Sequence, residues 1–318
     1  MTRVVDTYAT QEQKSINYSC ELLGKSRQVY YRKIKSIERK QTQAKEVIEL
    51  VKQVRYQLPR LGTRKLYHIL QNELQAMKIG RDKLFDILRA NHLLIEPKRS
   101  YHITTNSHHR FRKHKNLIEE VVPTRPNEQW VSDITYIGKR ENPMYLALIT
   151  DAYSKKIVGY DVSNSLDVNG CLRALKQAVK SRKNKKLPLI HHSDRGLQYC
   201  SDAYQKLLAK NKIECSMTES YDPYTNAVAE RINGILKQEF KIDCYGKNIE
   251  AKKVLIADAI KKYNTLRPHY SCFYKTPEQM HRQNEIPIRT YKKIGKEKYF
   301  SFPIKLTNFI PEKPVTVF

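Results

Sequence analysis

Hydrophobic residues recur with a helical period through the first part of the chain. This pattern predicts a short helix that ends near Gly24 and a second helix that Ser26 caps. In "AKEVIELVKQVRYQLP" an apolar stripe at helical spacing stops at Pro59, and two further amphipathic helices follow it. We therefore expect a helix-turn-helix-like segment at 1–40 and a second helical module at 41–96.

The period changes from helical to alternating at residue 128. The stretches "QWVSDITYIG", "MYLALITDAY" and "KKIVGYDVSN" predict three strands. A helix, the strand "LPLIHHSD", another helix, the strand "IECSMT" and the long helix "NAVAERINGILKQEF" follow in that order. This order predicts an α/β domain over 128–282, with a mixed sheet between helices and all-α modules upstream of it.

Two segments show no clear period. Residues 97–127 are basic and polar, and they are best described as a linker that lies along phosphates. Residues 283–318 form a basic C-terminal extension that alternates in places. For this extension two interpretations stay open, a partly ordered tail and a contact to DNA or to another subunit.

The net charge of the chain gives the strongest indication of its partner. The chain has 59 Lys and Arg against 32 Asp and Glu, a net charge of +27, and most of the surplus lies outside its central third. A surplus of this size favours a nucleic-acid partner over a merely soluble basic surface. The chain has no apolar run near the roughly 20 residues that span a bilayer. Six scattered cysteines without a signal peptide predict a cytoplasmic protein.

Basic side chains on the predicted helices are candidate DNA contacts. The helix that Ser26 caps presents Arg27 and Arg32, as the second helix of a helix-turn-helix does. The alternative is an amphipathic helical hairpin with a solvated basic face. The candidates in the following helical module are Arg64, Lys65, Arg81 and Lys83.

Three carboxylates have positions that together suggest a metal site. Asp133 lies within a strand, Asp194 ends a buried strand, and Glu230 shares a polar stripe with Lys237 on the last helix. Taken singly, each carboxylate also suits an ordinary role, as a hydrogen-bond acceptor at a strand end, a turn residue or a solvated helix residue. Together they would repel one another unless a cation neutralised them. Oxygen ligands suit Mg²⁺, and paired ions promote phosphoryl transfer.

Two other chemistries are disfavoured at the histidine pair that precedes Asp194. His191 and His192 have no cysteine or further histidine at zinc-ligand spacing, and the chain has no Cys-x-x-Cys. Ser193 lies directly beside the aspartate, and no base is placed to activate it. We therefore expect neither zinc nor a serine nucleophile.

The stretches "WVSDITYI", "HHSDRGLQYCS" and "DPYTNAVAERINGILKQEF" resemble the DDE transposases of the insertion-sequence-three family, bacterial relatives of retroviral integrases. The 35 residues between Asp194 and Glu230 are the interval typical of that group. "YNTLRPHYSCFYKTPEQ" and "RLGTRKLYHIL" resemble the segments that follow the glutamate helix and precede the catalytic domain there. The resemblance covers roughly residues 20–282.

This resemblance implies an RNase H-like catalytic domain that uses Mg²⁺ or Mn²⁺, as two ions, and that recognises the terminal inverted repeats of an element. Water would nick one DNA strand, and the freed 3′-hydroxyl would attack another phosphodiester. By position, Asp133, Asp194 and Glu230 become the catalytic metal ligands. Lys237 becomes a contact to the DNA backbone, and Asn226 and Arg195 become positioning residues.

The chain departs from the family pattern at two points. Thr225 precedes Asn226 where the family often has aspartate, a residue that is not a ligand. Family members are also often made as fusions with an upstream reading frame that carries a leucine zipper, and this chain has no sustained heptad. It is then either the downstream part of such a fusion or a chain that assembles by other contacts, and we expect at least a homodimer on double-stranded DNA.

Two alternative functions remain open from the sequence. The first is a non-catalytic DNA-binding regulator derived from a transposase, which has no need of three converging acids. The second is a metal-dependent endonuclease that cuts without joining, since the residues do not separate cleavage from strand transfer.

Overall fold

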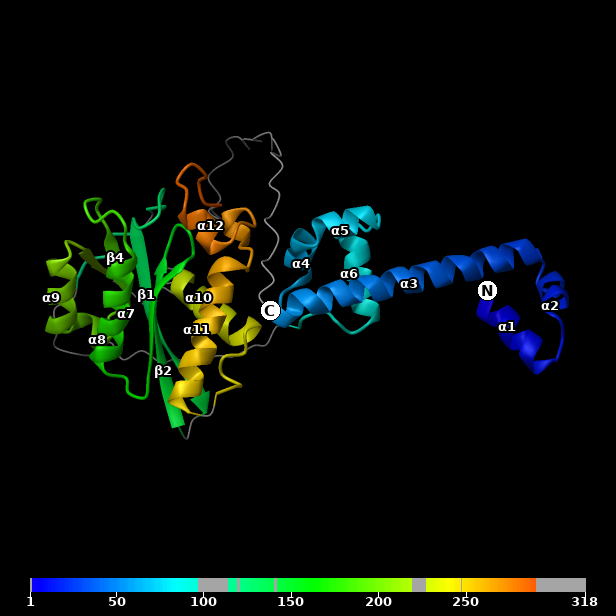
Figure 1. The fold of residues 1–318 in the computed structure, drawn as a ribbon, viewed down its shortest axis with the longest axis horizontal. Coiled ribbons are helices and arrows are strands. Elements are labelled where there is room, and N and C mark those ends of the chain that lie inside the picture. The colour runs from blue at the N-terminus through cyan, green and yellow to red at the C-terminus, as the bar shows by residue number, and fades with distance from the viewer. Residues whose placement is uncertain are drawn as a thin grey trace, which may run out of the picture.

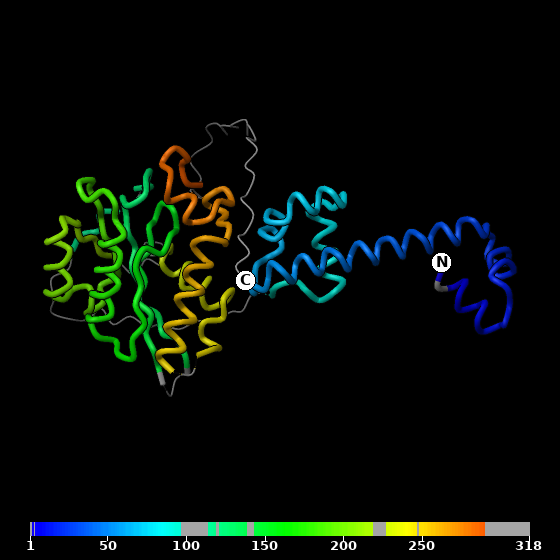
Figure 2. Tube along the Cα trace, viewed as in Figure 1, coloured from blue at the N-terminus to red at the C-terminus, as the bar shows by residue number. Residues whose placement is uncertain are grey.

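The computed structural model describes residues 2–96, 114–118, 121–139, 142–218, 227–246 and 248–289. Along its longest axis lie a small N-terminal helical cluster, a helical module and a sheet domain (Figure 1). The tube in Figure 2 follows the same order from blue to orange. Asn226, most of the expected linker and most of the C-terminal extension lie outside the described residues.

The N-terminal cluster packs two short helices against the start of a long one. Val5, Cys20 and Tyr30 form its small buried core. Gly24 adopts a positive φ of 62° after the second helix, and the Ser26 side chain accepts a hydrogen bond from a backbone N–H of the next. This agrees with the predicted turn. The helices are α1 (Thr2–Gln11), α2 (Ile16–Leu22) and α3 (Arg27–Gln57).

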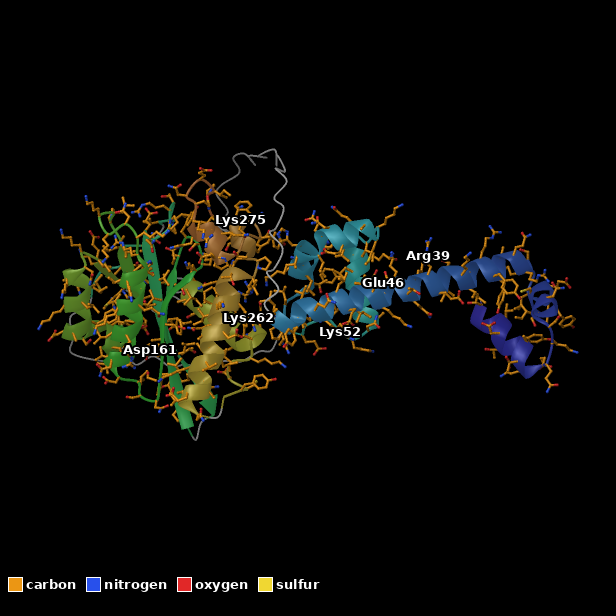
Figure 3. All side chains as sticks on the ribbon, in the orientation of Figure 1. Arg39, Glu46, Lys52, Asp161, Lys262 and Lys275 are labelled. Carbon is orange, nitrogen blue, oxygen red and sulfur yellow. The ribbon has the colours of Figure 1, made fainter. Side chains whose placement is uncertain are left out.

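The long helix α3 differs from the expectation. Its 31 residues run without a break across the boundary expected between residues 40 and 41, over a length of about 45 Å. Exposed charged side chains, Arg39 and Glu46 among them, project from its middle (Figure 3). The segment between the two predicted helices holds no glycine or proline, so nothing in it ends a helix.

The helical module packs three short helices against the second half of α3. Val47 and Val51 of α3 belong to the same buried cluster as Leu66, Leu74 and Leu84. A helical stripe that faces a core in this way was predicted for both segments. The short helices are α4 (Thr63–Ile69), α5 (Gln71–Ala76) and α6 (Arg81–Ala90).

The sheet domain contains five strands in the order β3-β2-β1-β4-β5. The first three form an antiparallel meander, and β4 and β5 add in parallel beside β1. This mixed sheet confirms the predicted RNase H-like α/β architecture. The strands are β1 (Gln129–Lys139), β2 (Asn142–Asp151), β3 (Ile157–Ser163), β4 (Ile190–Ser193) and β5 (Glu214–Met217).

Helices cover both faces of the sheet. Trp130 of β1 is buried on one face in a cluster with residues of α7, α8 and α9. Ile137 of the same strand lies on the other face, in a cluster with residues of α10 and α11. The helices are α7 (Val168–Ser181), α8 (Leu197–Cys200), α9 (Asp202–Lys210), α10 (Ala227–Glu239), α11 (Ile249–Thr265), the 3₁₀ turn η1 (Tyr270–Cys272) and α12 (Pro277–His281).

A short described part of the expected linker lies along the outer strand of the sheet. The Met217 N–H donates to the carbonyl of Lys115, and the Leu117 N–H donates to the side chain of Ser216 at 2.8 Å. These bonds occupy part of the free edge of β5. In the described ranges no helix is long and apolar enough to cross a membrane.

A buried ion cluster joins the helical module to the sheet domain. Arg267 donates from two nitrogens to the two carboxylate oxygens of Glu239, each at 2.7 Å, and its side chain is only 1% exposed. Lys65 of α4 donates to the same carboxylate at 3.3 Å. The His68 ring stacks on Tyr274 nearby, with ring centroids 4.9 Å apart. The end of α10 is therefore a contact point between the two parts (Figure 1).

We expect Glu239→Gln to lower the free energy of unfolding by about 3–5 kcal/mol, because removing one partner leaves the Arg267 guanidinium buried and uncompensated. Urea denaturation measures the change. Glu250→Gln is the matched control, since that carboxylate is 77% exposed and its ion pair with Lys253 contributes about 0.5 kcal/mol or less. Equal effects of the two substitutions would show that the cluster contributes no special stability.

Candidate active site

The sheet places Asp133 and Asp194 side by side. Strands β1 and β4 run parallel, with Trp130 paired with His191 and Val131 with His192. Asp133 and Asp194 each lie two residues beyond the second of these pairs. Because side chains alternate along a strand, Asp133 leaves the same face of the sheet as Val131, and Asp194 directly follows the end of β4 at the level of Asp133.

The helix α10 lies on that face and carries Glu230. Near its start, Val228 and Ala229 pack against Val131, two residues before Asp133 on β1. One turn after Glu230, the Asn233 side chain donates to Asp133 Oδ2 at 2.7 Å. The first turn of α10 is thereby held next to Asp133, and Glu230 is exposed beside it.

The electrostatics of Asp133 show that the charges of the other two acids act on it. Burial, followed by the negative charge of Asp194, raises the pKa of the Asp133 carboxyl from 3.8 to about 7. The charge of Glu230 raises this pKa further, whereas the hydrogen bonds from Asn233 and from the Ile134 N–H lower it. A carboxyl under these influences gains from a neighbouring cation.

The donors suit a hard divalent cation. All three candidate ligands are carboxylates, whose oxygens are the ligands that such a cation prefers. As they stand, no three Asp, Glu, His or Cys side chains in the described ranges are close enough to hold a metal ion.

The two histidines before Asp194 form hydrogen bonds with hydroxyl groups inside the sheet domain. His191 Nε2 lies 2.6 Å from the Ser132 hydroxyl and 2.9 Å from the Tyr204 hydroxyl. His192 Nδ1 lies 2.8 Å from the Ser216 hydroxyl. Burial lowers the pKa of His191 to about 3 and that of His192 to about 4, so both rings are neutral. Their place inside the sheet domain agrees with a role at the strand end.

The predicted DNA contacts are spread over the molecule. Lys237 lies two turns after Glu230 on α10 and is partly exposed, and Arg195 directly follows Asp194. Arg27 and Arg32 are exposed in the N-terminal part of α3, and Arg64 is exposed on α4.

The remaining basic candidates have protein partners. Lys65 is only 18% exposed and pairs with Glu239, so a phosphate would have to compete with that carboxylate. Arg81 pairs with Asp82 beside it, and Lys83 donates to the Gln43 side chain at 2.7 Å. Arg81 and Lys83 are nevertheless exposed.

Asn233 is the residue at this site that the sequence did not single out. The signal was present, because Asn233 falls on the same polar stripe of the last helix as Glu230 and Lys237. Only the fold reveals its contact, since Asp133 lies 100 residues away in the chain.

Comparison with known proteins agrees with this geometry. The integrase core domain family matches residues 123–223, and a second integrase core domain family matches residues 211–277. The chain is 34% identical over 225 residues to an uncharacterised 31 kDa protein of insertion element IS600 from Shigella sonnei, covering 69% of this chain and 81% of that protein. It is 30% identical to the transposase InsF of insertion sequence IS3fB from Escherichia coli, covering 62% and 69%.

A solved structure of the catalytic core domain of HTLV-2 integrase in complex with magnesium covers 49% of this chain, with 22% identity and a TM-score of 0.40. That score is too low to add to what the strand order already shows. The sheet and the matched domains define an integrase-type polynucleotidyl transferase. The chain belongs to the insertion-sequence-three family of DDE transposases. It is a transposase, and its fold implies the use of a divalent metal.

The raised pKa of Asp133 predicts a pH-dependent difference in stability between the wild type and Asp133→Asn in EDTA. A carboxyl whose pKa is raised on folding stabilises the protein below its unfolded pKa and loses that contribution as pH rises through its folded pKa. The melting temperature of the variant relative to wild type should therefore rise between about pH 4 and about pH 7 and then level off. Calorimetry across this pH range measures the difference in melting temperature, and a difference that stays constant with pH would contradict the raised pKa of Asp133.

Proposed function

We propose that Asp133, Asp194 and Glu230 are the catalytic ligands of two divalent cations, Mg²⁺ or Mn²⁺, and that this site cuts and joins DNA at the ends of an insertion sequence. The observation that carries the proposal is that the parallel register of β1 and β4 brings Asp133 of β1 level with Asp194, which directly follows β4, while Asn233 fixes α10 to Asp133. When bound, such ions activate an attacking oxygen and stabilise a leaving one.

The chemistry consists of two transfers at phosphorus. Water attacks a phosphodiester at the element end, a new P–O bond forms, and the bond to the 3′-oxygen breaks to release a 3′-hydroxyl. That hydroxyl then attacks a phosphodiester of the target, which joins the two DNAs and frees a second 3′-hydroxyl. The three carboxylates hold the reacting centre, and the sheet sets the separation of Asp133 and Asp194.

Basic side chains near the carboxylates would position the DNA. Lys237 contacts the backbone near the reacting end, from the same helix as Glu230, and Arg195 contacts a phosphate from the turn after Asp194. Asn226 would assist from the residue before α10. The upstream candidates bind the terminal inverted repeats with the exposed residues Arg27, Arg32, Arg64, Arg81 and Lys83, and with Lys65 when it leaves Glu239.

Two element ends must be brought together, so the active form is at least a homodimer on double-stranded DNA, in the bacterial cytoplasm. A protein from an upstream reading frame, either fused to this chain or separate from it, would be a further partner. The five segments proposed from the sequence divide the work between DNA-binding helices and a catalytic domain, with α3 as a rigid connection between the first two.

Two other activities compete with this proposal. A DNA-binding regulator would bind element ends without needing the three carboxylates. An endonuclease would use the carboxylates to cut without joining. The placement of Asp133 and Asp194 at the same level of the sheet favours an enzyme over a regulator. Membership of a transposase family favours joining over cleavage alone.

We expect the purified protein with labelled element ends and Mg²⁺ to give joined products, and Asp194→Asn to lower their yield by at least a hundredfold while DNA binding persists. The reason is that the amide cannot replace a charged oxygen ligand. Asp202→Asn, which changes a carboxylate at the start of α9, is the control and should retain activity. Cleavage without joining would favour the endonuclease, and binding without cleavage in the wild type would favour the regulator.

Lys237→Ala should weaken binding to element ends and to unrelated DNA alike. Loss of one phosphate contact should also lower the slope of log affinity against log salt by about 1. Fluorescence anisotropy between low and moderate salt measures both. Lys176→Ala is the matched control, because Lys176 is exposed on α7, on the opposite face of the sheet. An unchanged slope for Lys237→Ala would contradict the contact.

A further inference from the structure

Asn233 has an unusual environment for an amide. It lies on α10 between Ile232 and Gly234 and is 5% exposed. Its Nδ2 donates to Asp133 Oδ2 at 2.7 Å, and the other oxygen of Asp133 accepts from the Ile134 N–H at 2.9 Å. Both carboxylate oxygens of Asp133 therefore have a defined donor, one from its own strand and one from α10.

The other half of this amide is not satisfied. Asn233 Oδ1 is buried and has no hydrogen-bond partner among the described residues. A buried acceptor without a partner costs about 1–3 kcal/mol, so an apolar side chain of similar size would suit the packing of α10 better. Its neighbours Ile232, Ile235 and Leu236 are buried and apolar. The contribution of this amide is therefore its hydrogen bond to Asp133, made at the cost of an unsatisfied oxygen.

We propose that Asn233 is a positioning residue for the transposase reaction. Its Nδ2 fixes the rotation of the Asp133 carboxylate, so that the remaining lone pairs of that group face the site. The same bond holds the first turn of α10 against β1, which sets the place of Glu230 relative to Asp133. This inference rests on the proposed role of Asp133 and Glu230 as metal ligands.

Groups that orient a metal ligand typically account for a factor of 10 to 100 in metal affinity or activity. A merely structural amide would behave otherwise. Its loss would lower stability and leave the metal affinity of the folded protein unchanged. Metal affinity and stability therefore separate the two roles.

The test compares Asn233→Leu and Asn233→Ala with wild type, each without DNA. Titration calorimetry with Mn²⁺ gives the apparent affinity, and thermal unfolding in EDTA gives the stability. We expect Asn233→Leu to unfold near the wild-type temperature, because removal of the unsatisfied oxygen offsets the lost hydrogen bond to Asp133, yet to bind Mn²⁺ about 10- to 100-fold more weakly. Asn233→Ala should show the same loss of affinity even if Leu packs poorly. Cleavage of labelled element ends should fall in parallel.

Two controls separate the possible failures. Gln238→Ala removes an exposed amide from the same helix and should leave Mn²⁺ affinity unchanged. Asp133→Asn should abolish the Mn²⁺ binding that the site provides. If Asp133→Asn binds Mn²⁺ as wild type does, the proposed metal site is wrong. If Asp133→Asn loses binding while Asn233→Leu and Asn233→Ala keep it, the metal site stands and the role of Asn233 is overturned.

Discussion

The structure depends on placing the Asp133 carboxylate on the central strand, where burial and the charges of Asp194 and Glu230 oppose its ionisation. A single buried carboxylate is costly, and three together are more so, unless hydrogen bonds and a cation compensate. The parallel register of β1 and β4 brings two of the acids level, and α10 supplies both the third acid and an amide donor. Other parts of the sheet domain can be understood as the support for this arrangement.

Helix α10 connects the site to the rest of the molecule. Its first turn carries Glu230 beside Asp133, and its last residue, Glu239, pairs with Arg267 and with Lys65 of the helical module. One helix therefore contacts the proposed metal site at one end and the helical module at the other. Lys65 pairs with the Glu239 carboxylate in the structure, and the DNA contact proposed for it would compete with this pair. The proposed DNA binding would therefore be coupled to the docking of the helical module.

The sequence predicted those features that depend on local patterns. Alternation and helical periodicity predicted the order of strands and helices, and the positions of Asp133, Asp194 and Glu230 on them indicated one site. Features that depend on tertiary contacts could not be predicted from these local patterns. Lys65 and Glu239 are 174 residues apart, so charge pattern alone marked Lys65 as a DNA contact. The continuity of α3 was missed because its apolar stripe fades in the exposed middle, although no residue there ends a helix.

The most direct test of this account is the position of a bound ion. Crystals of the protein soaked in Mn²⁺ would be measured at a wavelength where manganese scatters anomalously. We expect an anomalous peak within ligand distance, about 2.0–2.3 Å, of carboxylate oxygens of Asp133 and Asp194, with Glu230 turned toward it. A fully occupied peak elsewhere, with none between these carboxylates, would contradict it.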